Sequence, residues 1–222
     1  MKYLFFGSLL GIVLLTGCQS LKPPHLSPAS TGISAPSFPL DTSSLLPSPL
    51  VSPAFEKALF KATMDIRDHH LTGLVFVKKM PDSGCRMVFS NEFGMTYFDV
   101  ETDNHHFQVN YCFAPLDKKM LWKILKTDFR LLLESGEDQV PDDWFVQDST
   151  NFLACKSRQG TIIRWNVYDP TETILMEVRG KSSFTDLARI TYAGYQNGFP
   201  SRIKLVNPII KLEISLSLIS FN

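Results

Sequence analysis

The sequence has no net charge and lacks the short motifs that identify common enzymes. Its 22 Lys and Arg residues balance 22 Asp and Glu residues. Without a basic excess there is no electrostatic basis for binding the phosphates of nucleic acids. A nucleophile elbow, a P-loop and an H-E-x-x-H zinc motif are also missing. We therefore expect neither a nucleic-acid-binding protein nor an enzyme, and we expect no cofactor.

The apolar run at the start is too short to span a membrane. It extends from Tyr3 to Leu15, about 13 residues, whereas a membrane-spanning helix needs roughly 20. Lys2 precedes the run, as in a signal peptide, and Leu15, Thr16 and Gly17 form a lipobox before Cys18. We expect cleavage before Cys18 and lipid attachment to its thiol. An ordinary secretory signal with a chance cysteine is the alternative.

The lipid on Cys18 predicts where the protein acts. One acyl chain binds a membrane only marginally, but two or three chains hold a protein there almost permanently. An Asp after the lipidated cysteine retains many enterobacterial lipoproteins in the inner membrane, so by resemblance Gln19 implies an outer-membrane lipoprotein. No acidic cluster of the kind associated with surface display follows Cys18, which favours the periplasmic face.

Composition divides the chain into three parts. Residues 1–17 are the signal peptide, 18–53 the lipidated cysteine and a tether, and 54–222 a β-rich domain. Eight of the 14 prolines lie between Gln19 and Pro53, where they exclude a helix or a central strand. Residues 55–60 can form a short helix. The apolar residues of the tether that can dock on the domain are Leu45, Leu46, Leu50 and Val51.

Short strands separated by turns dominate the rest of the chain. Their spacing of about 8 to 12 residues predicts one antiparallel sheet curled into an incomplete β-barrel. The expected strands are 71–79, 85–90, 95–101, 105–113, 144–148, 151–156, 161–168, 173–179, 184–192, 201–206 and 210–218.

One long helix, expected over about 117–133 with Asp117 as its N-cap, interrupts the strands. Its broad apolar face must pack on something, so we expect the helix to lie on the curved sheet. The fold class is thus mainly β (α+β). The space between helix and sheet is either a hollow for an apolar ligand or a solid core. Our candidates for cavity lining are Met120, Leu121, Ile124, Leu125, Phe107 and Tyr111.

Other polar residues give weaker signals. The pairs His69-His70 and His105-His106 could supply metal ligands, but neighbours on a strand point to opposite faces, so we expect exposed histidines and no metal site. The acidic residues Glu134, Glu137, Asp138, Asp142 and Asp143 fit no EF-hand and are expected in a solvated loop. Three thiols remain, Cys85, Cys112 and Cys155; we expect buried thiols, with one disulfide as the alternative.

Several segments between about Leu74 and Leu133 resemble short lipoproteins of Bacteroidetes to which no activity is assigned. They are Asn91-Glu92-Phe93-Gly94-Met95, Phe98-Asp99, Phe107-Gln108-Val109-Asn110-Tyr111 and Asp128-Phe129-Arg130-Leu131-Leu132-Leu133.

The architecture as a whole resembles the LolA/LolB-like fold of lipoprotein carriers, in which helices cover the hollow of an incomplete barrel. This resemblance implies a lipid-anchored protein that binds an acyl chain or receives lipoproteins. LolB-type receptors also carry an exposed apolar loop, which we do not identify in the sequence. The alternative is a structural or accessory lipoprotein, without a ligand cavity, whose long tether helps it to reach a protein partner of the envelope.

Overall fold

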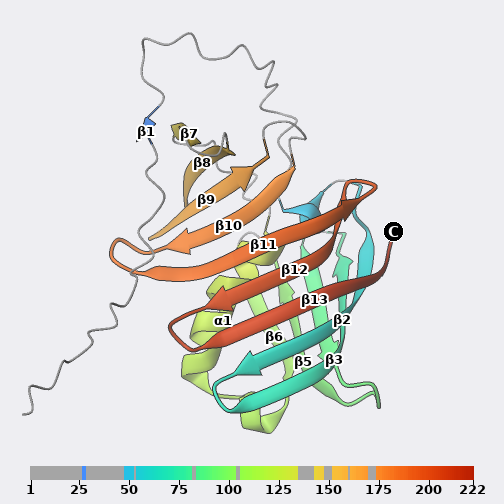
Figure 1. Cartoon of the computed structure of the whole chain (residues 1–222). Coiled ribbons are helices and arrows are strands. Elements are labelled where there is room, and N and C mark those ends of the chain that lie inside the picture. Colours follow the sequence, from blue (N-terminus) through green and yellow to red (C-terminus); the bar gives the residue numbers. More distant parts are fainter. Residues whose placement is uncertain are drawn as a thin grey trace, which may run out of the picture.

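Strands from the whole chain form a single antiparallel sheet that curves around one helix in the computed structural model (Figure 1). The structure describes residues 27–28, 48–52, 54–81, 84–103, 106–134, 143–147, 152–159, 161–169 and 174–222. The strands are β1 (Ser27–Pro28), β2 (Lys57–Ile66), β3 (His69–Lys79), β4 (Cys85–Ser90), β5 (Thr96–Thr102), β6 (Phe107–Cys112), β7 (Asp143–Gln147), β8 (Phe152–Gln159), β9 (Ile162–Tyr168), β10 (Leu175–Lys181), β11 (Asp186–Gln196), β12 (Phe199–Asn207) and β13 (Leu212–Phe221). The helices are η2 (Pro49–Val51), η3 (Ala114–Leu116) and α1 (Lys119–Leu133).

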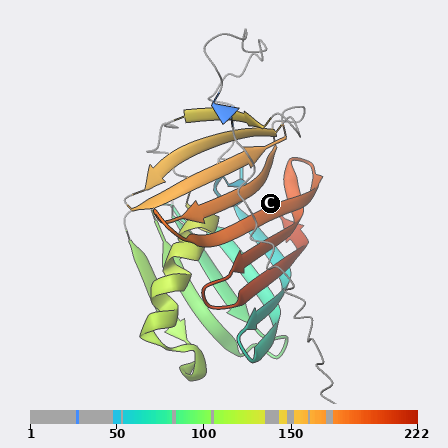
Figure 2. The same ribbon diagram turned by 60° about the vertical axis from the view of Figure 1, so that its left-hand side comes forward.

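The order of the strands explains how the helix comes to lie on the sheet. Across the sheet the order is β1-β7-β8-β9-β10-β11-β12-β13-β2-β3-β4-β5-β6. The last strand, β13, therefore pairs with the first long strand, β2, while β6 and β7 lie toward opposite edges. The chain returns from β6 to β7 through α1, which lies against the concave face (Figure 2). The expected open, incomplete barrel with one helix on it is confirmed.

Alternating burial along the strands places apolar side chains on the inner face. In β2, Phe60, Ala62 and Met64 are almost completely buried, and the residues between them are more exposed. Such alternation with a period of two is typical of a sheet with one covered face. The predicted short helix over residues 55–60 is wrong. Most of that segment belongs to β2, because backbone pairing with both β3 and β13 stabilises the extended form.

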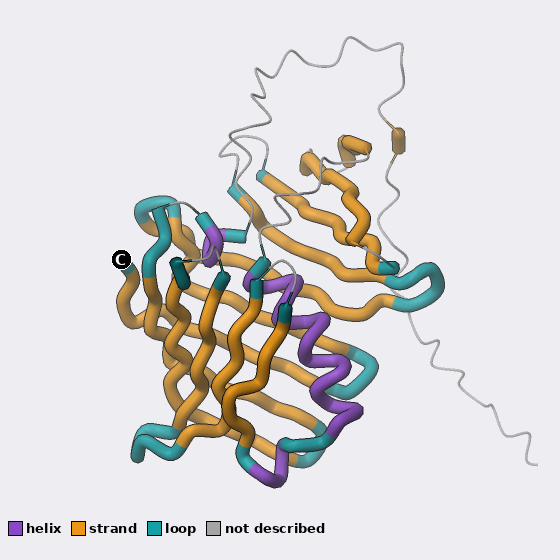
Figure 3. Tube along the Cα trace, turned by 180° about the vertical axis from the view of Figure 1, so that it is seen from behind, coloured by secondary structure: helices purple, strands orange, loops and turns teal. Residues whose placement is uncertain are grey.

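Helix α1 begins two residues later than expected. Lys118 is its N-cap and makes no side-chain capping hydrogen bond, so the prediction that Asp117 caps the helix is wrong. Asp117 instead ends η3, where its backbone N–H donates to the carbonyl oxygen of Ala114. The buried residues of α1 are Leu125, Asp128, Phe129, Leu131, Leu132 and Leu133. The buried residues thus lie mostly in the C-terminal half of the helix, and Figure 3 shows the helix beside the strands from behind.

Segments from the N-terminal side of the domain also contact its body. Leu50, in η2, is completely buried, so the expected docking of this residue is confirmed. Pro28 pairs with Phe145 at the outer edge of the sheet, a position where a proline needs no ladder hydrogen bond. Leu45 and Leu46 lie outside the described residues, and the division into signal peptide, tether and domain stays a prediction. No helix in the described part of the chain is long and apolar enough to cross a membrane.

Candidate functional site

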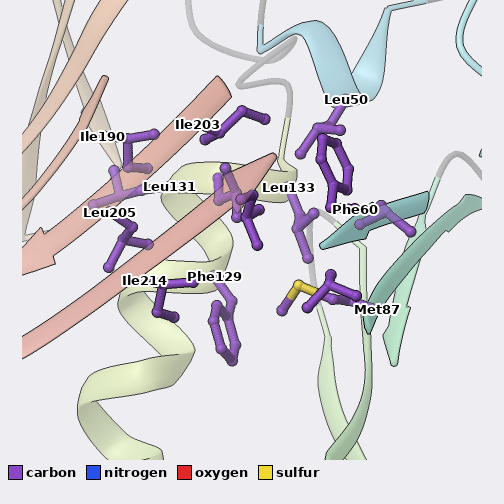
Figure 4. Close-up of a cluster of buried hydrophobic side chains, with 14 of the residues drawn as sticks. Leu50, Phe60, Met87, Phe129, Leu131, Leu133, Ile190, Ile203, Leu205 and Ile214 are labelled. Carbon is purple, nitrogen blue, oxygen red and sulfur yellow. The ribbon is translucent and has the colours of Figure 1, made fainter. Parts of the chain in front are cut away.

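The candidate site is the interior between the curved sheet and α1. It is lined entirely by apolar side chains: Ala62, Met64, Val75, Met87, Phe89, Phe98, Phe129, Leu132, Ile203, Leu205, Ile214 and Leu216. Phe129, from the helix, points toward side chains of the sheet such as Ile214 (Figure 4). The remaining void measures about 10 Å³, about the room that one water molecule needs. The helix therefore closes and fills the interior in this conformation.

The six predicted lining residues differ in their burial. Leu125 is buried against the sheet, and Phe107, Leu121 and Ile124 are half-buried at the margin of the core. Met120 and Tyr111 are exposed, with 68% and 49% of their surface accessible. None of the six is among the residues that line the void. Their role in lining a ligand cavity stays a prediction, which would require the helix to move.

A buried carboxyl group on α1 is hydrogen-bonded to the end of strand β12. Asp128 is completely buried, and Nδ2 of Asn207, at the end of β12, lies 3.0 Å from its Oδ1 and 2.9 Å from its Oδ2. Oδ1 of Asn207 accepts a hydrogen bond from the backbone N–H of Ile209, which fixes the amide. Burial raises the pKa of Asp128 to about 7, although the hydrogen bond from Asn207 lowers it.

A second polar contact holds the C-terminal end of α1. Arg164, on β9, is almost completely buried, and its Nη1 donates to the carbonyl oxygen of Glu134 at 3.2 Å. A cation at a helix C-terminus is stabilised by the backbone dipoles. Glu134 itself is only 2% exposed, and its carboxylate accepts hydrogen bonds from Arg130 and Thr102. The expected solvated acidic loop is therefore wrong for Glu134, because these two donors hold its carboxylate inside. The expectation is also wrong for Asp143, which begins β7 and pairs with Lys156 on β8. Glu137, Asp138 and Asp142 lie outside the described residues.

The third contact comes from the segment before the domain. Ser48 is completely buried, and its hydroxyl donates to the carbonyl oxygen of Leu132 at 2.7 Å. The hydroxyl oxygen of Ser48 also lies 3.4 Å from the hydroxyl oxygen of Tyr192 on β11. Three polar contacts from β12, β9 and the Ser48 segment thus hold the half of α1 that fills the interior.

An exposed aromatic residue stands at the tip of the β4–β5 turn. Phe93 is 97% exposed, and Met95 beside it is 42% exposed. The turn is well ordered by Asn91, whose Oδ1 accepts hydrogen bonds from the backbone N–H groups of Phe93 and Met95. Gly94 takes a positive φ of 87°, which a side chain would disfavour. The turn therefore presents an apolar side chain to its surroundings.

The other residues considered from the sequence are placed as follows. His69 and His70 are exposed, as expected, and Nδ1 of His70 lies 2.5 Å from Asp65. His105 lies outside the described residues, and so do Leu15, Thr16, Gly17 and Cys18. In the described ranges no group of three or more His, Cys, Asp or Glu residues is placed to hold a metal ion. Cys85 and Cys155 are buried free thiols, and Cys112 is a half-buried one.

The fold is similar to that of proteins of known structure. Superposition on a LolA superfamily protein, NE2245 from Nitrosomonas europaea, gives a TM-score of 0.51 at 9% identity over 81% of this chain and 92% of that one. A DUF1329 family protein from Desulfovibrio piger gives 0.43 at 7% identity over 77% and 86%. No model of a known protein family matches the sequence, and neither does any curated protein. The structure thus has a LolA-like fold, as expected, whereas the likeness to Bacteroidetes lipoproteins stays a prediction.

Sequence reasoning missed Phe93, Asp128 and Arg164. Asp128 carries a detectable signal, since it lies three residues after Leu125 and four before Leu132 and therefore on the apolar face of the helix. The signal for Phe93 is that it is an aromatic residue in a predicted turn, between the polar Glu92 and Gly94. For Arg164 the alternation of β9 alone does not reveal which face is buried, because both faces of that strand are partly covered.

Proposed function

We propose that the protein is a lipid-anchored carrier of the cell envelope that holds an acyl chain between its curved sheet and α1. The observation that carries this proposal is the all-apolar interior, which is closed by the C-terminal half of a single helix. Moving α1 exposes the inner faces of six strands to an apolar ligand. The LolA-like fold is consistent with such a role, although fold alone does not define function. In this proposal the protein is a carrier rather than an enzyme.

The proposed mechanism uses the membrane twice: to anchor the protein and to receive the acyl chain. Cys18 carries the lipid that holds the protein on the periplasmic face of the outer membrane. The Phe93 turn is the apolar contact through which a bound acyl chain passes into the membrane, as the exposed loop does in LolB-type receptors. An aromatic side chain is well suited to the boundary between water and lipid.

The proposal is tested by ligand binding to the intact lipoprotein. We expect native mass spectrometry after gentle extraction to show a co-purifying lipid, and a fluorescent fatty acid to bind and be displaced by palmitate. Phe129→Leu shortens a side chain that fills the interior, so it should increase the affinity for the fatty acid. Phe76→Leu is the matched control, because Phe76 lies outside the void and is 38% exposed. A protein that purifies without lipid and takes up no fatty acid, with or without Phe129→Leu, contradicts the proposal.

The small size of the void favours a second candidate function. A core that leaves only about 10 Å³ also suits a structural or accessory lipoprotein of an envelope complex, with no ligand at all. Cross-linking in cells separates the two candidates. A stoichiometric protein partner together with no bound lipid supports the accessory role, whereas bound lipid and only background capture support the carrier.

A further inference from the structure

Arg164 has more hydrogen-bonding capacity than the described protein uses. Its Nε donates to Oδ1 of Asn166 at 3.0 Å, and its Nη1 donates to the carbonyl oxygen of Glu134. Its Nη2 is buried and has no hydrogen-bond partner among the described residues. A buried donor without an acceptor is costly, and it is costlier on a charged group. The contact with the end of α1 therefore accounts for the burial of Nη1, whereas the burial of Nη2 has no explanation in these contacts.

The positive charge of Arg164 has no carboxylate of its own to balance it. The ionisable groups that affect its pKa are Tyr192, Tyr168, Cys155 and Glu134, and burial lowers that pKa. Burial also raises the pKa values of the two tyrosines and the cysteine, so all three are neutral near pH 7. Glu134 is the one anion of the set, and its carboxylate pairs with Arg130. Two arginines therefore share one carboxylate at this end of α1.

The inner face of the sheet is apolar around the void and carries polar side chains on β8 and β9. The strands that line the void, β2 to β5, β12 and β13, contribute only apolar residues to it. On β8 and β9, by contrast, Ser157 and Arg164 lie opposite each other, and Cys155 lies opposite Asn166. Gly180, opposite Arg164 on β10, leaves room for Leu131, since a Cβ there would lie 2.4 Å from Leu131 Cδ1. The end of α1 thus lies at the boundary between the two parts.

We propose that Arg164 binds the anionic head group, a carboxylate or a phosphate, of a single-chain amphiphile whose acyl chain enters the apolar interior. The division of the inner face matches such a molecule, with the chain beneath Phe129 and the head group at the C-terminal end of α1. A guanidinium suits this task because its planar donors match the oxygens of a carboxylate or phosphate. The inference rests on the proposed function and defines its ligand class: an anionic amphiphile rather than a neutral one.

The test uses the full chain with Cys18→Ser, which removes the anchor and keeps every described residue. Palmitate, a lysophosphatidate and neutral monopalmitin are titrated against this protein and against its Arg164→Gln, Arg164→Lys and Arg158→Gln variants. Arg158 is an exposed arginine on β8 and serves as the matched control. We expect Arg164→Gln to weaken the binding of both anionic amphiphiles by about 10- to 100-fold and Arg164→Lys by less, since a hydrogen bond to a charged group contributes about 1.5–3 kcal/mol. Monopalmitin binding should not change. Comparing palmitate with the lysophosphatidate shows which anion is preferred.

Two further measurements separate the failure of this inference from the failure of the proposed function. Acetate and inorganic phosphate, which need no acyl cavity, are tested for thermal stabilisation that is lost in Arg164→Gln. The ¹⁵Nη signals of Arg164 are followed by NMR in the chain with the native Arg164, so the result does not depend on a folded variant. Equal binding of palmitate and monopalmitin, with unchanged Nη signals, overturns the inference while the carrier function stands. Stabilisation by the small anions without any amphiphile binding supports the anion site and overturns the carrier.

Discussion

Asn207 hydrogen-bonds both oxygens of the carboxyl group of Asp128, at 3.0 and 2.9 Å, although the two residues are 79 positions apart in the sequence. The contact joins the middle of α1 to the end of β12. It lies inside the protein, where a charge is poorly solvated, so the protonation state of Asp128 affects how firmly the helix is held.

This pair predicts that the protein becomes less stable as the pH rises. Burial raises the pKa of Asp128 from 3.8 to about 7, so the native state keeps a proton that the unfolded chain releases. Between about pH 4 and pH 7 the contribution of Asp128 to the free energy of unfolding should therefore fall by about 1.4 kcal/mol per pH unit. Urea unfolding of Asp128→Asn should lack this part of the pH dependence, and the variant should be more stable than the native chain at pH 8. Asp117→Asn, at an exposed residue, is the control. An unchanged pH slope in Asp128→Asn contradicts the prediction.

The close approach of Gly180 and Leu131 predicts a coupled pair. Gly180→Ala places a Cβ against Leu131 Cδ1 and should lower the free energy of unfolding by about 1–3 kcal/mol through overpacking. In a Leu131→Ala background the same change should have almost no effect, because the clashing atoms are gone. Denaturant unfolding of the four proteins measures the coupling. Additive effects of the two substitutions would show that α1 does not pack tightly on β10.

Phe93 predicts a membrane contact that does not depend on the lipid anchor. In the full chain with Cys18→Ser, Phe93→Ser should weaken binding to phospholipid vesicles by about 30-fold, since burying a Phe side chain contributes roughly 2 kcal/mol. Phe93→Leu should keep most of the binding. Thermal stability should not change in either variant, because Phe93 is 97% exposed. Sedimentation with vesicles measures the effect, and equal binding of Phe93→Ser and the native turn refutes the contact.

The three thiols of the domain should differ in reactivity. Burial raises the pKa of Cys85 to about 11 and also raises the pKa values of Cys155 and Cys112, so thiolates are scarce at pH 8. Cys112 is the least buried and should react first with iodoacetamide, whereas Cys85 and Cys155 should react only on unfolding. Mass spectrometry of timed samples identifies the modified residue. Rapid labelling of Cys85 in the native protein would mean that the Leu50 segment, which covers its sulfur, is displaced.

The strands could be predicted from the sequence because alternation is a local property. β4 was predicted without error, and most other strands agreed to within about two or three residues at each end, within the usual uncertainty of strand ends. β1 and β2 are the exceptions: β1 lies in the segment expected to be a tether, and β2 is stabilised by pairing with β13, more than a hundred residues away, as well as with β3. The cavity candidates followed the apolar stripe of the helix at Met120 and Leu121. The structure buries the other end, at Phe129 and Leu132, because these side chains meet the inner faces of β2 to β5, β12 and β13 around the void.

The sequence by itself determined the β-rich architecture, its single long helix and the prediction of an anchor at Cys18. Each follows from residues that are neighbours along the chain: a period of two, an apolar stripe, a lipobox after an apolar run. Only the tertiary structure decided that the interior is filled, that Asp128 meets Asn207 and that Arg164 is buried with an unpaired Nη2 among the described residues. These depend on which distant strands the curved sheet brings together around α1, and no local pattern encodes that pairing.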